Sequence, residues 1–237
     1  ASRGLGDVYK RQELYHAHAQ RLALMLQNQT EEEFADSRFQ VLSELTRLRQ
    51  LCCDPALVYE NYEGGSAKLD LCIELIQSAV ESGHKILLFS QFTSMIEILT
   101  ARLQEESISC FVLQGSTKKE QRAQMVEQFN RDDTSVFCIS LKAGGTGLNL
   151  TGADIVIHYD PWWNVAVENQ ATDRAHRIGQ KNVVTVYKLI AKGTIEEKII
   201  KLQQMKKELA EEILSGDEIK TASFQREELL ELLEERF

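Results

Sequence analysis

The spacing of apolar residues changes along the chain and separates a helical region from an α/β region. Before residue 52, apolar residues recur at steps of three and four, the spacing of amphipathic helices. These residues are Leu22, Leu24, Leu26, Phe34, Phe39, Leu42, Leu45 and Leu48. Because the residue before a proline is pushed out of the helical conformation, Asp54-Pro55 is predicted to end this region. Residues 1–12 show no convincing periodicity, so we interpret them as a fragment boundary or cloning remnant of a longer protein.

After the turn-rich segment 61–66, short apolar runs alternate with amphipathic stretches. The runs lie at 85–90, 110–113, 135–141, 154–159 and 183–191. Helices are expected at 67–82, 92–105, 118–130 and in the stretch that follows Asn164. Apolar runs without polar alternation indicate a parallel sheet buried on both faces. The sequence therefore predicts an α/β fold, with a parallel sheet sandwiched by helices.

The last part of the chain is predicted to be helical again. Thr194-Ile-Glu-Glu197 has the pattern of a capping box and is expected to open a helix that reaches about Leu214. A short acidic amphipathic helix is expected within 224–237. Four segments follow from these patterns. They are the unplaced segment 1–12, a helical lead-in and linker 13–66, an α/β lobe 67–193, and a long helix with an acidic helix 194–237.

A candidate anion-binding segment runs from Gln170 to Gln180 and reads Gln-Ala-Thr-Asp-Arg-Ala-His-Arg-Ile-Gly-Gln. On a helix, Gln170, Arg174 and Arg177 would share one face. Two neighbouring guanidiniums repel each other and therefore need an anion. A polyphosphate fits them, because the planar guanidinium presents several donors to phosphate oxygens.

The same segment has an ordinary alternative interpretation. The two arginines could be solvated and paired with Asp173 and Glu168 in weak surface ion pairs. The helix is expected to have Asn164 as its N-cap and Gly179 as its C′ residue. Neither the spacing nor the caps decide between the two interpretations.

Other candidate residues gather where the predicted strands end, the edge at which parallel sheets bind ligands. The glycine-rich loop 142–149 can bring backbone amides close to a phosphate, although a structural tight turn is at least as compatible with it. It is not a Walker A loop, and the chain has no Asp-Glu-x-His/Asp box for magnesium. Trp162 is interpreted as a lid on the core, whereas Trp163 could face a DNA backbone. Ser90-Gln91 and Gly115-Ser116-Thr117 suit phosphate contacts or helix caps.

Charge and cysteine content narrow the class of protein. The net charge of −9 comes mostly from the ends, since residues 68–195 carry 13 basic and 14 acidic side chains. An acidic protein does not bind nucleic acid through its overall field, so any DNA contact must be local. The five scattered cysteines indicate reduced thiols of an intracellular protein, and no membrane span or signal peptide is visible. We interpret His158 and His176 as structural, and no metal site is predicted.

Taken in order, several motifs resemble the second RecA-like lobe of superfamily-two helicase-like ATPases, specifically the Swi/Snf branch of double-stranded DNA translocases. They are Phe-Ser-Gln-Phe at 89–92, Gly-Ser-Thr at 115–117, Ser-Leu-Lys-Ala-Gly-Gly-Thr-Gly-Leu-Asn-Leu at 140–150, Asp-Pro-Trp-Trp-Asn at 160–164 and the arginine segment at 170–180. The lead-in 48–55 resembles the segment that leads into this lobe in the family. Residues 193–197 resemble the start of the helix that braces the family's two lobes. The family often has histidine where Asp54 stands, a small departure.

The resemblance implies specific roles. Arg174 and Arg177 would be arginine fingers that stabilise charge on the γ-phosphate, and Gln170 would orient them. The residues implied for the nucleotide and the lobe interface are Gly144, Gly145, Gly147, Asn149 and Asp173. Those implied for DNA contact, mostly through phosphates, are Gln91, Ser116, Thr117, Ser140, Lys142 and Trp163.

The resemblance also implies cofactors and partners. ATP and Mg²⁺ would be held mainly by a first lobe that this chain lacks, so the chain alone is expected to be inactive. The expected partners are double-stranded DNA, that N-terminal lobe and DNA-bound protein cargo, with no membrane. A competing hypothesis is a non-catalytic interaction module with inert arginines. A dinucleotide-binding oxidoreductase domain is disfavoured, because no Gly-x-Gly-x-x-Gly follows the first strand.

Overall fold

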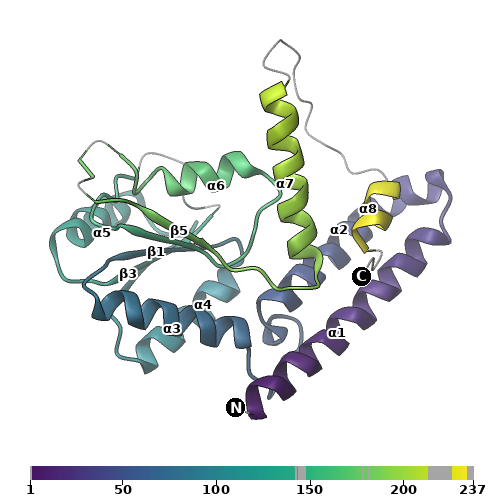
Figure 1. The fold of residues 1–237 in the computed structure, drawn as a ribbon, viewed down its shortest axis with the longest axis horizontal. Helices are drawn as coiled ribbons and strands as arrows, with labels where there is room; N and C mark the ends of the chain where they lie inside the picture. Colours follow the sequence, from purple (N-terminus) through teal and green to yellow (C-terminus); the bar gives the residue numbers. More distant parts are fainter. Residues whose placement is uncertain are drawn as a thin grey trace. The chain divides into compact units, whose positions relative to one another are not determined.

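A computed structural model of the protein describes residues 2–141, 143, 148–177, 179–180, 182–212 and 226–233. The chain divides into two compact units (Figure 1). One unit contains residues 67–190, and the other contains residues 1–66 together with 191–237. Among the described residues, no helix is both long enough and apolar enough to cross a membrane.

The unit of residues 67–190 is built on a parallel five-stranded sheet in the order β2-β3-β1-β4-β5. The strands are β1 (Ile86–Ser90), β2 (Cys110–Leu113), β3 (Val136–Ser140), β4 (Ile155–His158) and β5 (Thr185–Lys188). The helices are α3 (Ala67–Glu81), α4 (Thr93–Glu105), α5 (Lys119–Arg131) and α6 (Val165–Thr172). Figure 1 shows α3 and α4 on one face of the sheet and α5 and α6 on the other. The predicted α/β fold is confirmed.

Both faces of the central strands are buried, which explains why their sequences lack polar alternation. Every residue of β1, β3 and β4 is buried, whereas every residue of the edge strand β5 is exposed. Alternate residues of the central strands form a core under α5 and α6, with Phe89, Phe137 and Val156 at its centre. Because these strands are packed into the core, the points at which the loops leave their carboxyl ends are held in place.

The second unit is helical. Its elements are α1 (Ser2–Gln27), α2 (Glu31–Cys53), a 3-10 turn (Pro55–Leu57), α7 (Ile195–Glu212) and α8 (Arg226–Leu233). A capping box separates α1 from α2, since Thr30 Oγ1 accepts from the Glu33 amide and Glu33 Oε2 accepts from the Thr30 amide. Much of the segment 1–12, for which no element was predicted, lies in α1.

The start of α7 differs in detail from the predicted capping box. Thr194 Oγ1 accepts from the Glu196 amide at 3.2 Å, and Glu197 reaches the Gly193 amide at 2.9 Å, one residue before the expected partner. The hydroxyl of Tyr15 accepts from the Ile195 amide at 2.6 Å. The first two amides of α7 are therefore partnered by side chains, one from α1 and one from the residue before α7, as free helix amides require.

Candidate functional site

Hydrogen bonds join the loops at the carboxyl ends of β1, β3 and β4 into one connected edge. Buried Asp160, after β4, accepts from the Ser90 hydroxyl at 2.5 Å and from the Gln91 amide at 3.3 Å. The Leu141 amide, after β3, donates to the Ser90 carbonyl at 3.0 Å. A buried carboxylate that accepts one short hydrogen bond and a second from a main-chain amide is a strong anchor, so together with the Leu141 bond it holds the three loops in a fixed relation.

The predicted DNA-contacting residues that the structure describes lie at this edge, but they are not equally accessible. Ser116 is exposed, and Thr117 and Trp163 are half-buried. Gln91 and Ser140 are only 8% and 2% exposed, so both side chains are buried in this structure. Their burial indicates a supporting position beneath the exposed loops. Lys142 lies outside the described residues.

The arginine segment does not form the predicted helix. Asn164 caps α6 as expected, its side chain accepting from the Ala166 amide at 3.0 Å, but α6 ends at Thr172. Arg174 and Arg177 therefore lie beyond the helix, and the prediction that they share a helical face with Gln170 is wrong. Gly179 has the expected positive φ of 109°, although it is not the C′ residue of α6.

Tertiary hydrogen bonds hold the segment that follows the helix. A longer helix would use the Arg174 and Ala175 carbonyls as acceptors for amides four residues later. Instead, the Arg174 carbonyl accepts from the Leu150 amide at 3.0 Å, and the Ala175 carbonyl accepts from Gln180 Nε2 at 3.1 Å. Gln180 Nε2 also donates to the Ala153 carbonyl at 2.7 Å. These bonds fasten the arginine segment to the chain that enters β4.

The two arginines have different environments. Arg174 is 3% exposed, and its guanidinium lies 5.5 Å from the centre of the Phe89 ring. Burial, together with the positive charge of Arg177, lowers the pKa of Arg174 to about 10. Arg177 is exposed, and its Nε donates to the Asp173 carbonyl at 3.2 Å. One guanidinium is thus packed into the core while its neighbour faces solvent.

A polar network around buried Glu168 ties α6 to the sheet. Glu168 accepts from Lys188 Nζ at 2.5 Å and from the Trp162 amide at 2.6 Å. His158 stacks on Phe89 and shares a hydrogen bond of 3.0 Å with the Thr172 hydroxyl. Burial lowers the pKa of His158 to about 4, with the Lys188 charge acting in the same direction and Glu168 opposing it. The ring is therefore neutral at pH 7.

The residues predicted at the nucleotide and lobe interface are only partly described. Asn149 and Asp173 are exposed, as is Gln170, whereas Gly144, Gly145 and Gly147 lie outside the described residues. In the part of the chain that the structure describes, no group of three or more His, Cys, Asp or Glu residues is placed to hold a metal ion. The accessible guanidinium of Arg177 and the carboxamides of Gln170 and Asn149 fit the oxygens of a polyphosphate.

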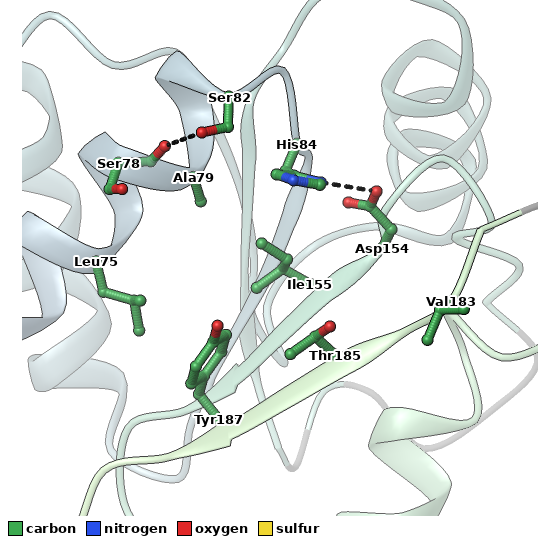
Figure 2. A pocket seen from close by; sticks show the side chains of 10 residues that line it. All are labelled: Leu75, Ser78, Ala79, Ser82, His84, Asp154, Ile155, Val183, Thr185 and Tyr187. Atoms are coloured by element: carbon green, nitrogen blue, oxygen red, sulfur yellow. Dashed lines mark hydrogen bonds and ion pairs between the residues drawn. The ribbon is translucent and has the colours of Figure 1, made fainter.

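A cavity of about 220 Å³ lies at the opposite edge of the sheet, near the starts of β4 and β5. Figure 2 shows His84 and Asp154 at one end of it, with Nδ1 of the imidazole 2.9 Å from Oδ2 of the carboxylate. Tyr187 and Leu75 line the other end. None of the predicted site residues lines this cavity, so it is separate from the candidate site.

Sequence reasoning missed the residues that hold the site together. Asp160 and Glu168 each accept from one side chain and from one main-chain amide, and Gln180 donates to three main-chain carbonyls. Glu168 was considered only as a surface partner of the arginines. Their roles depend on which strands are neighbours, and that order is not visible in a single sequence.

Comparisons with known proteins place this arrangement in a family. Residues 67–179 match the family model of the helicase conserved C-terminal domain. The chain is 45% identical over 202 residues to an uncharacterized ATP-dependent helicase of Mycoplasma pneumoniae, an alignment that covers 84% of this chain and 19% of that protein. It resembles the SWI2/SNF2 ATPase C-terminal domain of Sulfolobus solfataricus with a TM-score of 0.70 and 32% identity, over 88% of this chain and 86% of that one. The chain belongs to the SWI2/SNF2 ATPase family.

The SWI2/SNF2 assignment confirms the predicted RecA-like C-terminal lobe and identifies the chain as a helicase C-terminal domain. A second solved relative, the Sulfolobus solfataricus SWI2/SNF2 ATPase core in complex with double-stranded DNA, has a TM-score of 0.72 and 33% identity, over 87% of this chain and 43% of that one. The chain spans about a fifth of the length of the first relatives that it matches in sequence.

Proposed function

We propose that this chain is the second ATPase lobe of a two-lobed motor that moves along double-stranded DNA, and that it supplies Arg177 and Arg174 to an ATP molecule held by the first lobe. One observation carries the proposal. Two arginines stand beside each other after α6, one packed on Phe89 and the other exposed, in a segment fastened by hydrogen bonds from Leu150 and Gln180.

The electrostatics of the pair support this role. Burying Arg174 beside Arg177 costs free energy, as the lowered pKa of Arg174 shows. A nearby polyphosphate would relieve that cost, because it adds negative charge to a partly desolvated pair of cations. Arg177 is the side chain that can reach such a ligand without unfolding its surroundings, since it is already exposed.

The chemistry assigned to the chain is electrostatic. ATP supplies the γ-phosphoryl group for transfer to water, and Mg²⁺ on the first lobe would neutralise the β- and γ-oxygens. Arg177 would donate hydrogen bonds to oxygens on which negative charge develops, a contribution typically worth ~10³–10⁵ in rate. Arg174 would hold the segment on the core and add positive potential. Gln170 would orient the exposed guanidinium of Arg177. Asn149, Asp173 and the three glycines of the loop would face the nucleotide and the other lobe.

Contacts with DNA are proposed at the carboxyl edge. A SWI2/SNF2 relative has been solved with double-stranded DNA, which supports duplex as the partner. Ser116, Thr117 and Trp163 are the accessible candidates, and Lys142 is added from the sequence. Gln91 and Ser140 would support these loops from beneath. Hydroxyl and amide groups of this kind contact phosphates, so we expect binding without sequence specificity.

The whole-motor activity can be tested directly. We expect the full-length motor to hydrolyse ATP with strong stimulation by duplex, while this chain alone is silent because it lacks the phosphate-gripping lobe. Turnover is measured without DNA, with single strands and with duplex, for both proteins. The absence of turnover under every condition would favour the competing hypothesis of a non-catalytic interaction module, and equal stimulation by single strands would contradict the duplex assignment.

A further inference from the structure

Arg122, in the first turns of α5, links two loops that belong to different strands. Its Nε donates to the Thr117 carbonyl at 2.8 Å, and its Nη2 donates to the Gly115 carbonyl at 3.1 Å and the Gln114 carbonyl at 3.3 Å. These three acceptors lie in the loop after β2. Its Nη1 donates to the Ala143 carbonyl at 2.9 Å, in the loop after β3.

These contacts fix the positions of main-chain atoms and do not neutralise a charge. A guanidinium carries five N–H donors in a rigid plane and accepts no hydrogen bonds. Within the described chain, every partner of Arg122 is a main-chain carbonyl, so the contacts fix the path of two backbones and neutralise no carboxylate. A lysine has a single ammonium nitrogen at the end of a flexible stem and cannot span the same carbonyls at once.

A second residue of α5 holds the far end of the same glycine-rich loop. Asn130 Nδ2 donates to the Asn149 carbonyl at 2.8 Å, and Asn130 Oδ1 accepts from the Gly152 amide at 2.9 Å. A Cβ atom on Gly152 would lie 3.0 Å from Asn130 Oδ1 and 3.1 Å from Asn130 Cα, so this approach depends on glycine. Side chains of helix α5 thus hydrogen-bond to the loop at Ala143 and again after Leu148.

We propose that Arg122 is a positioning residue that makes the loop after β2 and the loop after β3 move as one unit against DNA. The inference rests on the proposed function, because Ser116 and Thr117 stand on the first loop and Lys142 on the second. Without Arg122, each loop would keep its own residues but lose its fixed spacing to the other. Two contacts that must fit one duplex backbone would then bind with a larger loss of conformational entropy.

The first experiment needs no catalytic activity. In this chain, Arg122→Lys and Arg122→Ala are compared with wild type by amide hydrogen exchange. We expect exchange at residues 114–117, 143 and 148–150 to rise roughly tenfold or more, while exchange in β1 and α3 stays unchanged. The matched control is Arg131→Lys in the same helix, an arginine that is 77% exposed and pairs with Glu127 at 2.8 Å.

The second experiment uses the full-length motor and its duplex-stimulated ATP turnover. We expect Arg122→Lys to raise the duplex concentration for half-maximal stimulation by roughly tenfold, with the rate at saturating duplex reduced less than about threefold. A residue that only stabilises the fold would lower both the rate and the amount of active protein without this split. Arg131→Lys should match wild type in both quantities.

The outcomes separate the two proposals. If wild-type turnover does not respond to duplex, the proposed function fails, and hydrogen exchange still decides whether Arg122 couples the loops. If wild type responds but Arg122→Lys has the same half-saturating duplex concentration, the positioning role is overturned. If Arg122→Lys kept wild-type hydrogen exchange while Arg122→Ala did not, the role would also be overturned, since a positive charge alone would then be sufficient. Should Arg122→Ala fail to fold, the lysine variant carries the test.

Discussion

At the scale of single residues, two guanidinium groups of the arginine segment have different surroundings and therefore different expected roles. Arg174 and Arg177 are three positions apart, but only Arg177 is exposed, and Arg174 lies against the Phe89 ring. Substitution of Arg174 would therefore open a gap in the core as well as remove a charge. Arg177 offers the cleaner test of catalysis, because its removal leaves the packing intact.

We expect Arg177→Ala to reduce ATP turnover of the full-length motor by ~10³-fold or more, the typical contribution of an arginine finger. Duplex affinity should change by less than about threefold, since Arg177 is not among the proposed DNA contacts. Turnover and fluorescence binding of duplex are measured on the same preparations. Arg131→Ala serves as the exposed-arginine control, and a variant that keeps turnover within tenfold of wild type would remove Arg177 from the finger role.

His158 gives a second prediction at this scale, on the stability of the chain against pH. Its pKa is lowered to about 4 in the folded state, mainly by burial, against an ordinary value of 6.5. Between these values the unfolded chain binds a proton that the folded ring does not, so stability falls as the pH decreases from about 6.5 towards 4. The full difference is about 3 kcal/mol, of which roughly 2 kcal/mol should be lost by pH 5.

The measurement is the free energy of unfolding by urea from pH 7.5 to pH 4.5, for wild type and His158→Gln. Carboxylates titrate in both proteins, so the difference between the two curves isolates the histidine. We expect wild type to lose stability relative to the variant as the solution becomes acidic. A difference that stays constant from pH 7 to pH 5 would mean that His158 can be protonated without cost in the fold.

At the scale of elements, the sequence was sufficient for what depends on neighbours along the chain. Every strand was predicted where it occurs, because the apolar runs of a doubly covered parallel sheet have few other interpretations. Asn164 was correctly placed as the N-cap of α6 from its local pattern alone. The parallel pairing and the two covered faces followed from the alternation of strands and helices.

Elements that depend on distant partners could not be predicted in the same way. Helix α6 ends at Thr172, and the carbonyls of the two arginine-segment residues 174 and 175 accept from Leu150 and Gln180, donors that come from outside the helix. The roles of Asp160 and Arg122 likewise require knowing that particular loops meet at one edge. Thr30 is a different case, since its capping box with Glu33 was present in the sequence and was overlooked beneath the leucine periodicity.

At the scale of the whole molecule, the carboxyl edge of one sheet gathers the candidate site. Asp160 ties the loop after β4 to the loop after β1, and Arg122 ties the loops after β2 and β3 to α5. In the proposed motor, small changes at a nucleotide would have to reach the DNA contacts, which requires loops that move together. The hydrogen bonds at this edge would provide that stiffness. All of them lie within residues 67–190.

Because this unit contains a complete sheet, helices on both of its faces and its own core, we expect residues 67–190 to fold when produced alone. The expected result is a cooperative urea transition and dispersed amide resonances. The matched comparison is residues 67–180, which lack β5 and therefore Lys188, the ion-pair partner of buried Glu168. An uncompensated buried carboxylate is strongly destabilising, so the shorter fragment should unfold at clearly lower urea. If instead 67–190 were unfolded while the complete chain unfolded in a single transition, the sheet would depend on the helical unit, and the division into two folding units would be wrong.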